Sequence, residues 1–216
     1  MDETAFRSGF VALVGRPNAG KSTLVNALIG EKVAITSERA QTTRHRLRAI
    51  LNAEGAQIIL VDTPGLHKPH DALGEEVNRA TYKAIEDVDA LCFLVDSTQP
   101  VGAGDRWIAE LIAQVDAPAL AVLTKCDLAT PEQIAAQRAA VAELVPGGCD
   151  RGPGVVSRCK SEGEGGRSRT RATPIATHLC EKGPGVVSHT IQELSAVTGA
   201  GLADFVDALV DLLPEG

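Results

Sequence analysis

Residues 15–22 read Gly-Arg-Pro-Asn-Ala-Gly-Lys-Ser, a run whose residue types and spacing suit the binding of phosphate groups. In the pattern G-x-x-x-x-G-K-[ST], glycines let backbone N–H groups curl around phosphates, and the N-terminus of the following helix adds partial positive charge. An apolar segment at 10–14 precedes the run and a helical pattern at 21–29 follows it, which is the setting that this loop requires. We therefore expect Lys21 to reach the β- and γ-phosphates of a nucleotide and the Ser22 hydroxyl to coordinate Mg²⁺.

A second group, Asp-Thr-Pro-Gly at 62–65, follows the apolar run at 57–61. An acid at the carboxyl end of a buried parallel strand is placed to meet Mg²⁺ through water. We expect Asp62 to take this role and the Gly65 N–H to contact a γ-phosphate. The same four residues would also suit an ordinary turn after a strand. Their position downstream of a phosphate-binding run favours the metal site.

A third group, Thr-Lys-Cys-Asp at 124–127, closes the apolar run at 119–123. It differs by one residue from Asn-Lys-x-Asp, the motif that reads guanine. The Asp127 carboxylate can accept hydrogen bonds from both N1–H and N2–H of guanine, which adenine does not offer. The aliphatic stem of Lys125 can lie over the base. Thr124 keeps a hydroxyl but lacks the amide of asparagine, so we expect guanine preference with weaker affinity.

The elements that must position these groups alternate between strands and helices. Near-continuous apolar runs predict buried strands, which are typical of parallel sheets covered on both faces; they lie at 10–14, 58–61, 90–95 and 119–123. Helical patterns lie at 21–29 and at about 74–86, 104–115, 131–144 and 201–213. The sequence therefore predicts an α/β fold of the P-loop NTPase type, a mostly parallel open sheet with helices on both faces.

Composition and charge exclude several classes of protein. The 216 residues carry 21 Lys and Arg against 28 Asp and Glu, a net charge of −7 that disfavours wrapping nucleic acid around the whole surface. No apolar run approaches the roughly 20 residues of a membrane span, and 1–7 do not resemble a signal peptide. The five cysteines lack paired spacing, so we expect reduced thiols and a cytoplasmic protein.

The pattern fails over 147–188, a stretch of 42 residues with nine Gly and three Pro. Its seven Lys and Arg exceed its four Asp and Glu, and a nine-residue phrase occurs twice, at 149–157 and 180–188. With few large apolar residues, the stretch is expected to be a disordered insertion in a single domain over 8–213. Three origins fit this composition: a lineage-specific loop, wrongly framed or joined coding sequence, or a basic RNA-binding arm.

The three motifs, in this order, resemble those of translation-factor-class GTPases, and the chain is similar to the bacterial Era GTPases, a family of ribosome-assembly factors. The resemblance covers about 8–146 and 194–213. It rests on Gly-Arg-Pro-Asn-Ala-Gly-Lys-Ser-Thr-Leu-Val-Asn-Ala-Leu at 15–28, Ala-Gln-Thr-Thr-Arg-His-Arg at 40–46, and Asp-Thr-Pro-Gly-Leu-His at 62–67. The segment at 40–46 is the most diagnostic, because related GTPases carry other residues in that switch.

The resemblance implies further site residues. Thr43, or alternatively Thr42, would meet Mg²⁺ and the γ-phosphate beside Ser22 and Asp62. Asn18 would help hold K⁺, and backbone N–H groups at Ser195-Ala196 would contact the guanine oxygen. The implied catalytic residues are Lys21, Thr43 and Gly65. The implied GTP-binding set is Gly15, Arg16, Pro17, Asn18, Ala19, Gly20, Lys21, Ser22, Thr23, Asp62, Thr63, Pro64, Gly65, Thr124, Lys125, Asp127, Ser195 and Ala196.

The implied activity is Mg²⁺-dependent hydrolysis of GTP to GDP and phosphate, with a role in small ribosomal subunit assembly and 16S rRNA processing. Leu66 stands where Ras-like enzymes carry a water-orienting Gln, so hydrolysis is expected to be slow and stimulated by K⁺ or a partner. Switches are expected at 31–46 and 62–75. No KH domain is expected after Leu213, which puts rRNA binding in doubt; peripheral membrane contact is implied by resemblance alone. The alternatives are a truncated or defective G domain and a related GTPase of tRNA modification or ribosome maturation.

Overall fold

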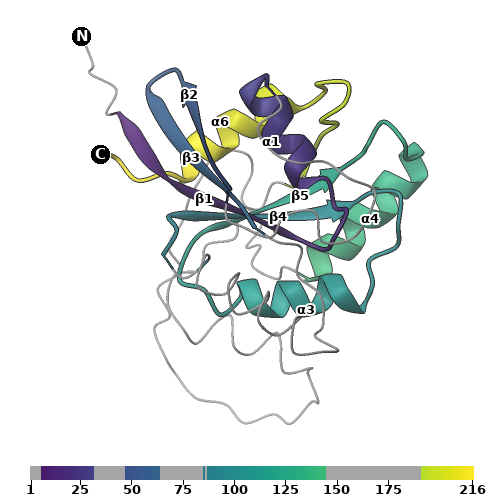
Figure 1. The fold of residues 1–216 in the computed structure, drawn as a ribbon. Helices are drawn as coiled ribbons and strands as arrows, with labels where there is room; N and C mark the ends of the chain where they lie inside the picture. Colours follow the sequence, from purple (N-terminus) through teal and green to yellow (C-terminus); the bar gives the residue numbers. More distant parts are fainter. Residues whose placement is uncertain (1–5, 32–46, 64–84, 86, 145–190) are drawn as a thin grey trace, which may run out of the picture.

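The structure, a computed structural model, describes residues 6–31, 47–63, 85, 87–144 and 191–216. Most of the helix expected at 74–86, most of both expected switches, and the whole of 147–188 lie outside these residues. The described strands are β1 Arg7–Gly15, β2 Leu47–Ala53, β3 Ala56–Asp62, β4 Ala90–Asp96, β5 Ala119–Thr124 and β6 Gln192–Glu193. The described helices are α1 Lys21–Ile29, α3 Ala103–Ile112, α4 Pro131–Leu144 and α6 Leu202–Leu212 (Figure 1).

The strands form one sheet in the order β2-β3-β1-β4-β5-β6. β1 is parallel to β3 and β4, and β5 is parallel to β4 and β6. This confirms the expected mostly parallel sheet. After β1 and α1 the chain forms β2 and β3, which lie on one side of β1 in the strand order, and it then forms β4, which lies on the other side of β1. The carboxyl end of β1 is therefore a switch point, where open α/β sheets place their ligands.

The antiparallel strand β2 was not among the strands predicted from the sequence. It pairs with β3 along its whole length, from Leu47 opposite Asp62 to Ala53 opposite Ala56. The turn between them contains Gly55 at φ 68°, a conformation that glycine adopts without steric cost. At this sheet edge Ile50 is 58% exposed whereas Ala49 is buried, so the apolar residues of β2 do not mark a single face.

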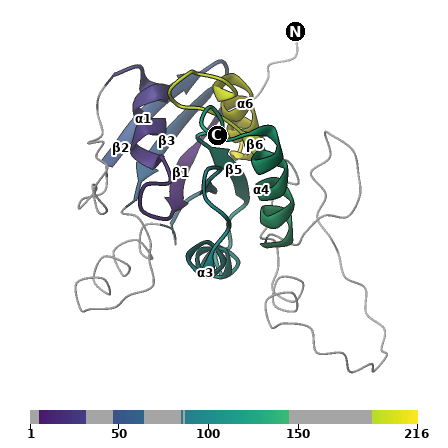
Figure 2. The same ribbon diagram turned by 90° about the vertical axis from the view of Figure 1, so that its right-hand side faces the viewer.

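The core lies on both faces of the sheet, because successive side chains of a strand point to opposite sides. On β1, Val11 and Leu13 pack with α1 and α6, whereas Ala12 and Val14 pack with α3 and α4. Figures 1 and 2 both show α3 on the opposite side of the sheet from α1 and α6. Burial on both faces explains why the central strands read as continuous apolar runs.

The short strand β6 is held in place by several contacts. Gln192 and Glu193 pair with β5, and the Leu194 N–H donates to the Leu123 carbonyl at 2.9 Å. Arg138 of α4 donates from Nε to Glu193 Oε1 at 2.9 Å. Gly201, at φ 74°, lies so close that a Cβ there would clash with the Glu193 carbonyl oxygen. These contacts set where the chain after β6 can run.

Gly201→Ala is expected to destabilise the fold through this clash, by at least about 2 kcal/mol beyond the ordinary cost of a left-handed alanine. Gly199→Ala is the matched control, because Gly199 has φ 81° and a Cβ added there would meet nothing within 4 Å. Urea unfolding of both variants measures the difference. Equal losses of stability would show that the contact with Glu193 does not constrain β6.

Candidate functional site

The phosphate loop joins the end of β1 to the start of α1, as the sequence predicts. Asn18 and Gly20 adopt left-handed conformations, at φ 64° and 87°. The Ala19 N–H donates to the Arg16 carbonyl at 3.2 Å and closes the turn. Lys21 opens α1, and its ammonium donates to the carbonyls of Gly15 at 3.1 Å and Arg16 at 2.8 Å. The loop is thus folded around the head of its own lysine.

The Lys21 side chain is buried, at 6% exposure. Burial lowers the pKa of Lys21 to about 8, and the charge of Asp62 offsets part of this effect. The ammonium has only neutral carbonyl oxygens as hydrogen-bond acceptors among the contacts described above. An anionic phosphate placed beside Lys21 would favour its charged form and gain attraction in a weakly solvated setting.

Ser22 and Asp62 meet at the mouth of this loop. The Ser22 hydroxyl donates to Asp62 Oδ2 at 2.8 Å, and Asp62 is buried at the end of β3. A hydroxyl and a carboxylate are hard oxygen donors of the kind Mg²⁺ prefers, so the residues present fit this ion. Thr63 differs from its neighbour, because its hydroxyl donates to the Leu13 carbonyl at 2.7 Å and supports β1.

The group at 124–127 lies beside the phosphate loop. The buried Thr124 hydroxyl donates to the Ala19 carbonyl at 2.9 Å, and the Val95 carbonyl lies 3.2 Å away as a second acceptor. Threonine therefore retains a link between β5 and the phosphate loop. Lys125 adopts a left-handed conformation at φ 58°. Asp127 is exposed, so its carboxylate is accessible to a ligand.

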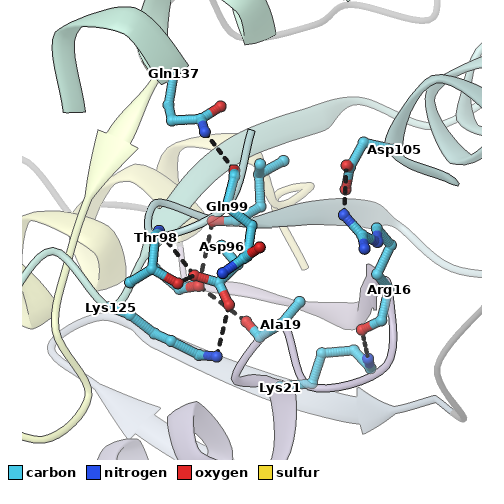
Figure 3. Close-up of polar contacts among 11 residues, drawn as sticks. Arg16, Ala19, Lys21, Asp96, Thr98, Gln99, Asp105, Lys125 and Gln137 are labelled. Atoms are coloured by element: carbon cyan, nitrogen blue, oxygen red, sulfur yellow. Dashed lines mark hydrogen bonds and ion pairs between the residues drawn. The ribbon is translucent and has the colours of Figure 1, made fainter. Parts of the chain in front are cut away.

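Asp96 is a site residue that was not among those predicted from the sequence. At the end of β4, its Oδ2 pairs with the Lys125 ammonium at 2.6 Å, and its Oδ1 accepts from the Thr98 N–H and hydroxyl (Figure 3). Burial alone would raise the pKa of Asp96, but the hydrogen bonds from Lys125 and Thr98 outweigh it and lower that pKa below its usual range. The signal was present in the sequence, because Asp96, like Asp62, ends a buried parallel strand.

Ser195 and Ala196 follow β6 and lie next to the group at 124–127. The Cys126 N–H donates to the Leu194 carbonyl at 3.3 Å, which joins the two loops. The buried Ser195 hydroxyl accepts from the N–H groups of Val197 at 3.3 Å and Thr198 at 3.1 Å. Ser195 thus shapes its own turn with its side chain.

Two hollows adjoin these loops. One, of about 470 Å³, is lined by Thr23 of α1 and Ala196, so these two predicted residues share a wall. The other, of about 310 Å³, is lined by Arg16, Pro17, Asn18, Ala19, Asp96, Gln99 and Asp105. Arg16, which lines the second hollow, donates to Asp105 of α3, a partner that no sequence motif indicated (Figure 3).

The remaining predicted site residues, Thr43, Pro64 and Gly65, lie outside the described residues, as do Leu66 and the alternative Thr42. Within the described part of the chain, the structure brings four groups together at the carboxyl ends of the parallel strands: the phosphate loop, Asp62, the 124–127 group and Ser195-Ala196. No helix among the described residues is long and apolar enough to cross a membrane.

Comparison with known proteins agrees with this arrangement. The model of the 50S ribosome-binding GTPase family matches residues 10–125, more than half of the chain. GTPase Era of Corynebacterium glutamicum is 51% identical over 144 residues, which cover 66% of this chain and 47% of that protein. GTPase Era of Synechocystis is 53% identical over 128 residues, 59% of this chain and 41% of that protein. The chain thus spans about half the length of these relatives.

Solved structures of Era are similar as well. One, in complex with MgGDPNP and a segment of 16S ribosomal RNA, has a TM-score of 0.69 and 30% identity, covering 98% of this chain and 58% of that chain. A variant of Aquifex aeolicus Era bound to GDP and AlF₄⁻ has a TM-score of 0.65 and 28% identity, with the same coverage. From its fold, its phosphate loop and the matching family model, this chain belongs to the 50S ribosome-binding GTPase family, and its relatives include the Era GTPases.

Proposed function

We propose that this chain binds GTP and GDP together with Mg²⁺ and hydrolyses GTP to GDP and phosphate. The observation that carries the proposal is the meeting of three groups at the end of β1. The Lys21 ammonium is buried inside the phosphate loop, and the Ser22 hydroxyl lies 2.8 Å from Asp62 Oδ2. A cation inside a phosphate loop and two oxygen donors beside it form the machinery of nucleotide hydrolysis in this class of fold.

In this proposal, residues of the phosphate loop bind and orient the nucleotide. Lys21 turns from the carbonyls of Gly15 and Arg16 to the β- and γ-phosphates, while backbone N–H groups of the loop contact the other phosphate oxygens. Ser22, Asp62 and Thr43 would hold Mg²⁺, which neutralises charge on the phosphates when bound. Gly65 would contact the γ-phosphate through its N–H and report its presence.

The guanine base is proposed to lie on the side of the site that is formed by 124–127 and Ser195-Ala196. Asp127 would accept from N1–H and N2–H of guanine, and Lys125 would cover the ring with its stem. Thr124 supports the proposal through its hydrogen bond to Ala19, which joins the base-reading strand to the phosphate loop. Backbone N–H groups at Ser195-Ala196 would meet the guanine oxygen. The docking of β6 against β5 favours a working base pocket over the alternative of a defective domain.

Hydrolysis is proposed to be slow without help, because Leu66 has no polar group with which to orient a water. Asn18, exposed in the phosphate loop, is the proposed K⁺ contact.

The proposed cellular role is assembly of the small ribosomal subunit. It is supported by the similarity to an Era that was crystallised with 16S ribosomal RNA. We expect the chain to cosediment with small subunits in the presence of a non-hydrolysable GTP analogue and less in GDP. Equal sedimentation in both nucleotides would argue against a nucleotide-controlled role on the ribosome.

Lys21→Ala is expected to weaken GDP and GTP binding by at least about a hundredfold, because the phosphates lose their cation in a buried site. Fluorescent GDP and ADP analogues measure binding, and phosphate release in KCl and in NaCl measures hydrolysis. The unaltered chain should bind the GDP analogue more tightly than the ADP analogue, and it should release phosphate faster in KCl than in NaCl. Arg106→Ala, which removes an exposed cation from α3, is the control. Normal GTP affinity in Lys21→Ala would overturn the proposal.

Asp96→Asn tests the pairing that holds Lys125. The change keeps an acceptor for Thr98 but removes the charge opposite the ammonium, so we expect GDP affinity to fall about fivefold, equivalent to about 1 kcal/mol. Asp116→Asn makes the same chemical change at an exposed position outside the site and should leave affinity unaltered. Isothermal titration with GDP compares the two variants. An unchanged Kd in Asp96→Asn would show that Lys125 needs no partner at β4.

A further inference from the structure

Asp105 is a buried carboxylate in the first turn of α3. Its side chain is 4% exposed, and it accepts from the Gly102 N–H at 2.9 Å and from Arg16 Nη1 at 3.0 Å. Aspartates are seldom buried to this degree unless they are paired, because an ionised carboxylate loses its hydration. Arg16, the second residue of the phosphate loop, provides the positive charge that pairs with it.

The start of α3 has the shape needed to receive Arg16. A Cβ at Gly104 would lie 3.3 Å from Arg16 Cδ, and a Cβ at Gly102 would lie 3.8 Å from Arg16 Nη1. The arginine stem therefore runs directly over the backbone of the first helical turn. Side chains larger than glycine at position 104 would compete with it for space.

Arg16 also makes a contact at its backbone. Its carbonyl accepts from the Lys21 ammonium at 2.8 Å and from the Ala19 N–H at 3.2 Å. One residue thus connects Asp105 of α3 to the lysine of the phosphate loop (Figure 3). Because Asn18 in the same loop has φ 64°, the loop conformation carries a backbone cost that surrounding contacts must offset.

We propose that Asp105 is a positioning residue for phosphate binding, which acts through Arg16 to fix the loop that presents Lys21 and the backbone N–H groups. The inference rests on the proposed function, since it assumes that the loop binds a nucleotide. In this proposal Asp105 acts through Arg16 and not by contact with a phosphate. The Arg16 side chain is 43% exposed, so solvent screens part of its attraction to the buried carboxylate.

The test is the dissociation rate of a fluorescent GDP analogue from the full chain, measured in Mg²⁺ at a temperature where every variant is folded. Asp105→Asn keeps an acceptor for the Gly102 N–H and loses the charge opposite Arg16. Arg16→Ala removes the other and more exposed partner of the ion pair. We expect each to raise the rate about tenfold, and the double variant to raise it no further, because both act through one contact.

Arg16→Lys retains a positive charge, so its dissociation rate should lie between that of the unaltered chain and that of Arg16→Ala. Arg106→Ala, next to Asp105 in α3, should leave the rate unchanged. A purely structural role for Asp105 would lower the melting temperature without altering the dissociation rate. That result, or additive effects in the double variant, would overturn the inference while the proposed function stands. If the unaltered chain does not bind GDP at all, the proposed function fails first.

Discussion

The Thr124 hydroxyl is the contact on which the geometry of the site depends. It has one proton to donate and lies within hydrogen-bond distance of two carbonyls, Ala19 in the phosphate loop and Val95 on β4. Because Thr124 is buried, water does not reach this position to replace its hydroxyl as the hydrogen-bond donor to either carbonyl. This side chain therefore links the loop at 15–22 to the strand β5, which leads to Lys125 and Asp127.

The connection between β4 and α3 reinforces the same two regions from the other side. Asp96, the last residue of β4, pairs with Lys125, and Asp105, in the first turn of α3, pairs with Arg16. Unpaired carboxylates would repel the phosphates of a nucleotide bound nearby. Here each carboxylate is paired with a cation, Lys125 or Arg16, so it would add little net negative charge where phosphates are proposed to lie.

The sequence predicted those features that local patterns determine. The bounds of α1 follow from Gly20 and Gly30, both left-handed, and α4 begins with Pro131 after a reciprocal pair of hydrogen bonds between Thr130 and Gln133. The sequence predicts α3 over about 104–115, but the helix ends at Ile112; no glycine or proline at 113–115 marks that end, so the predicted helix is too long. The end of a buried strand marks the place of Asp96, but the partners of Asp96 and Asp105 lie far away in sequence and only the fold brings them together.

The C-terminal segment 191–216 is held by buried apolar side chains as well as by the backbone pairing of β6 with β5. Phe205 and Leu209 of α6 are fully buried in the same core as α1, and Leu194 is buried beside β5. Ala196, in the turn that follows β6, packs against the same core. A cavity made at Phe205 would therefore lower the stability of the fold and also weaken the support of the turn at Ser195-Ala196.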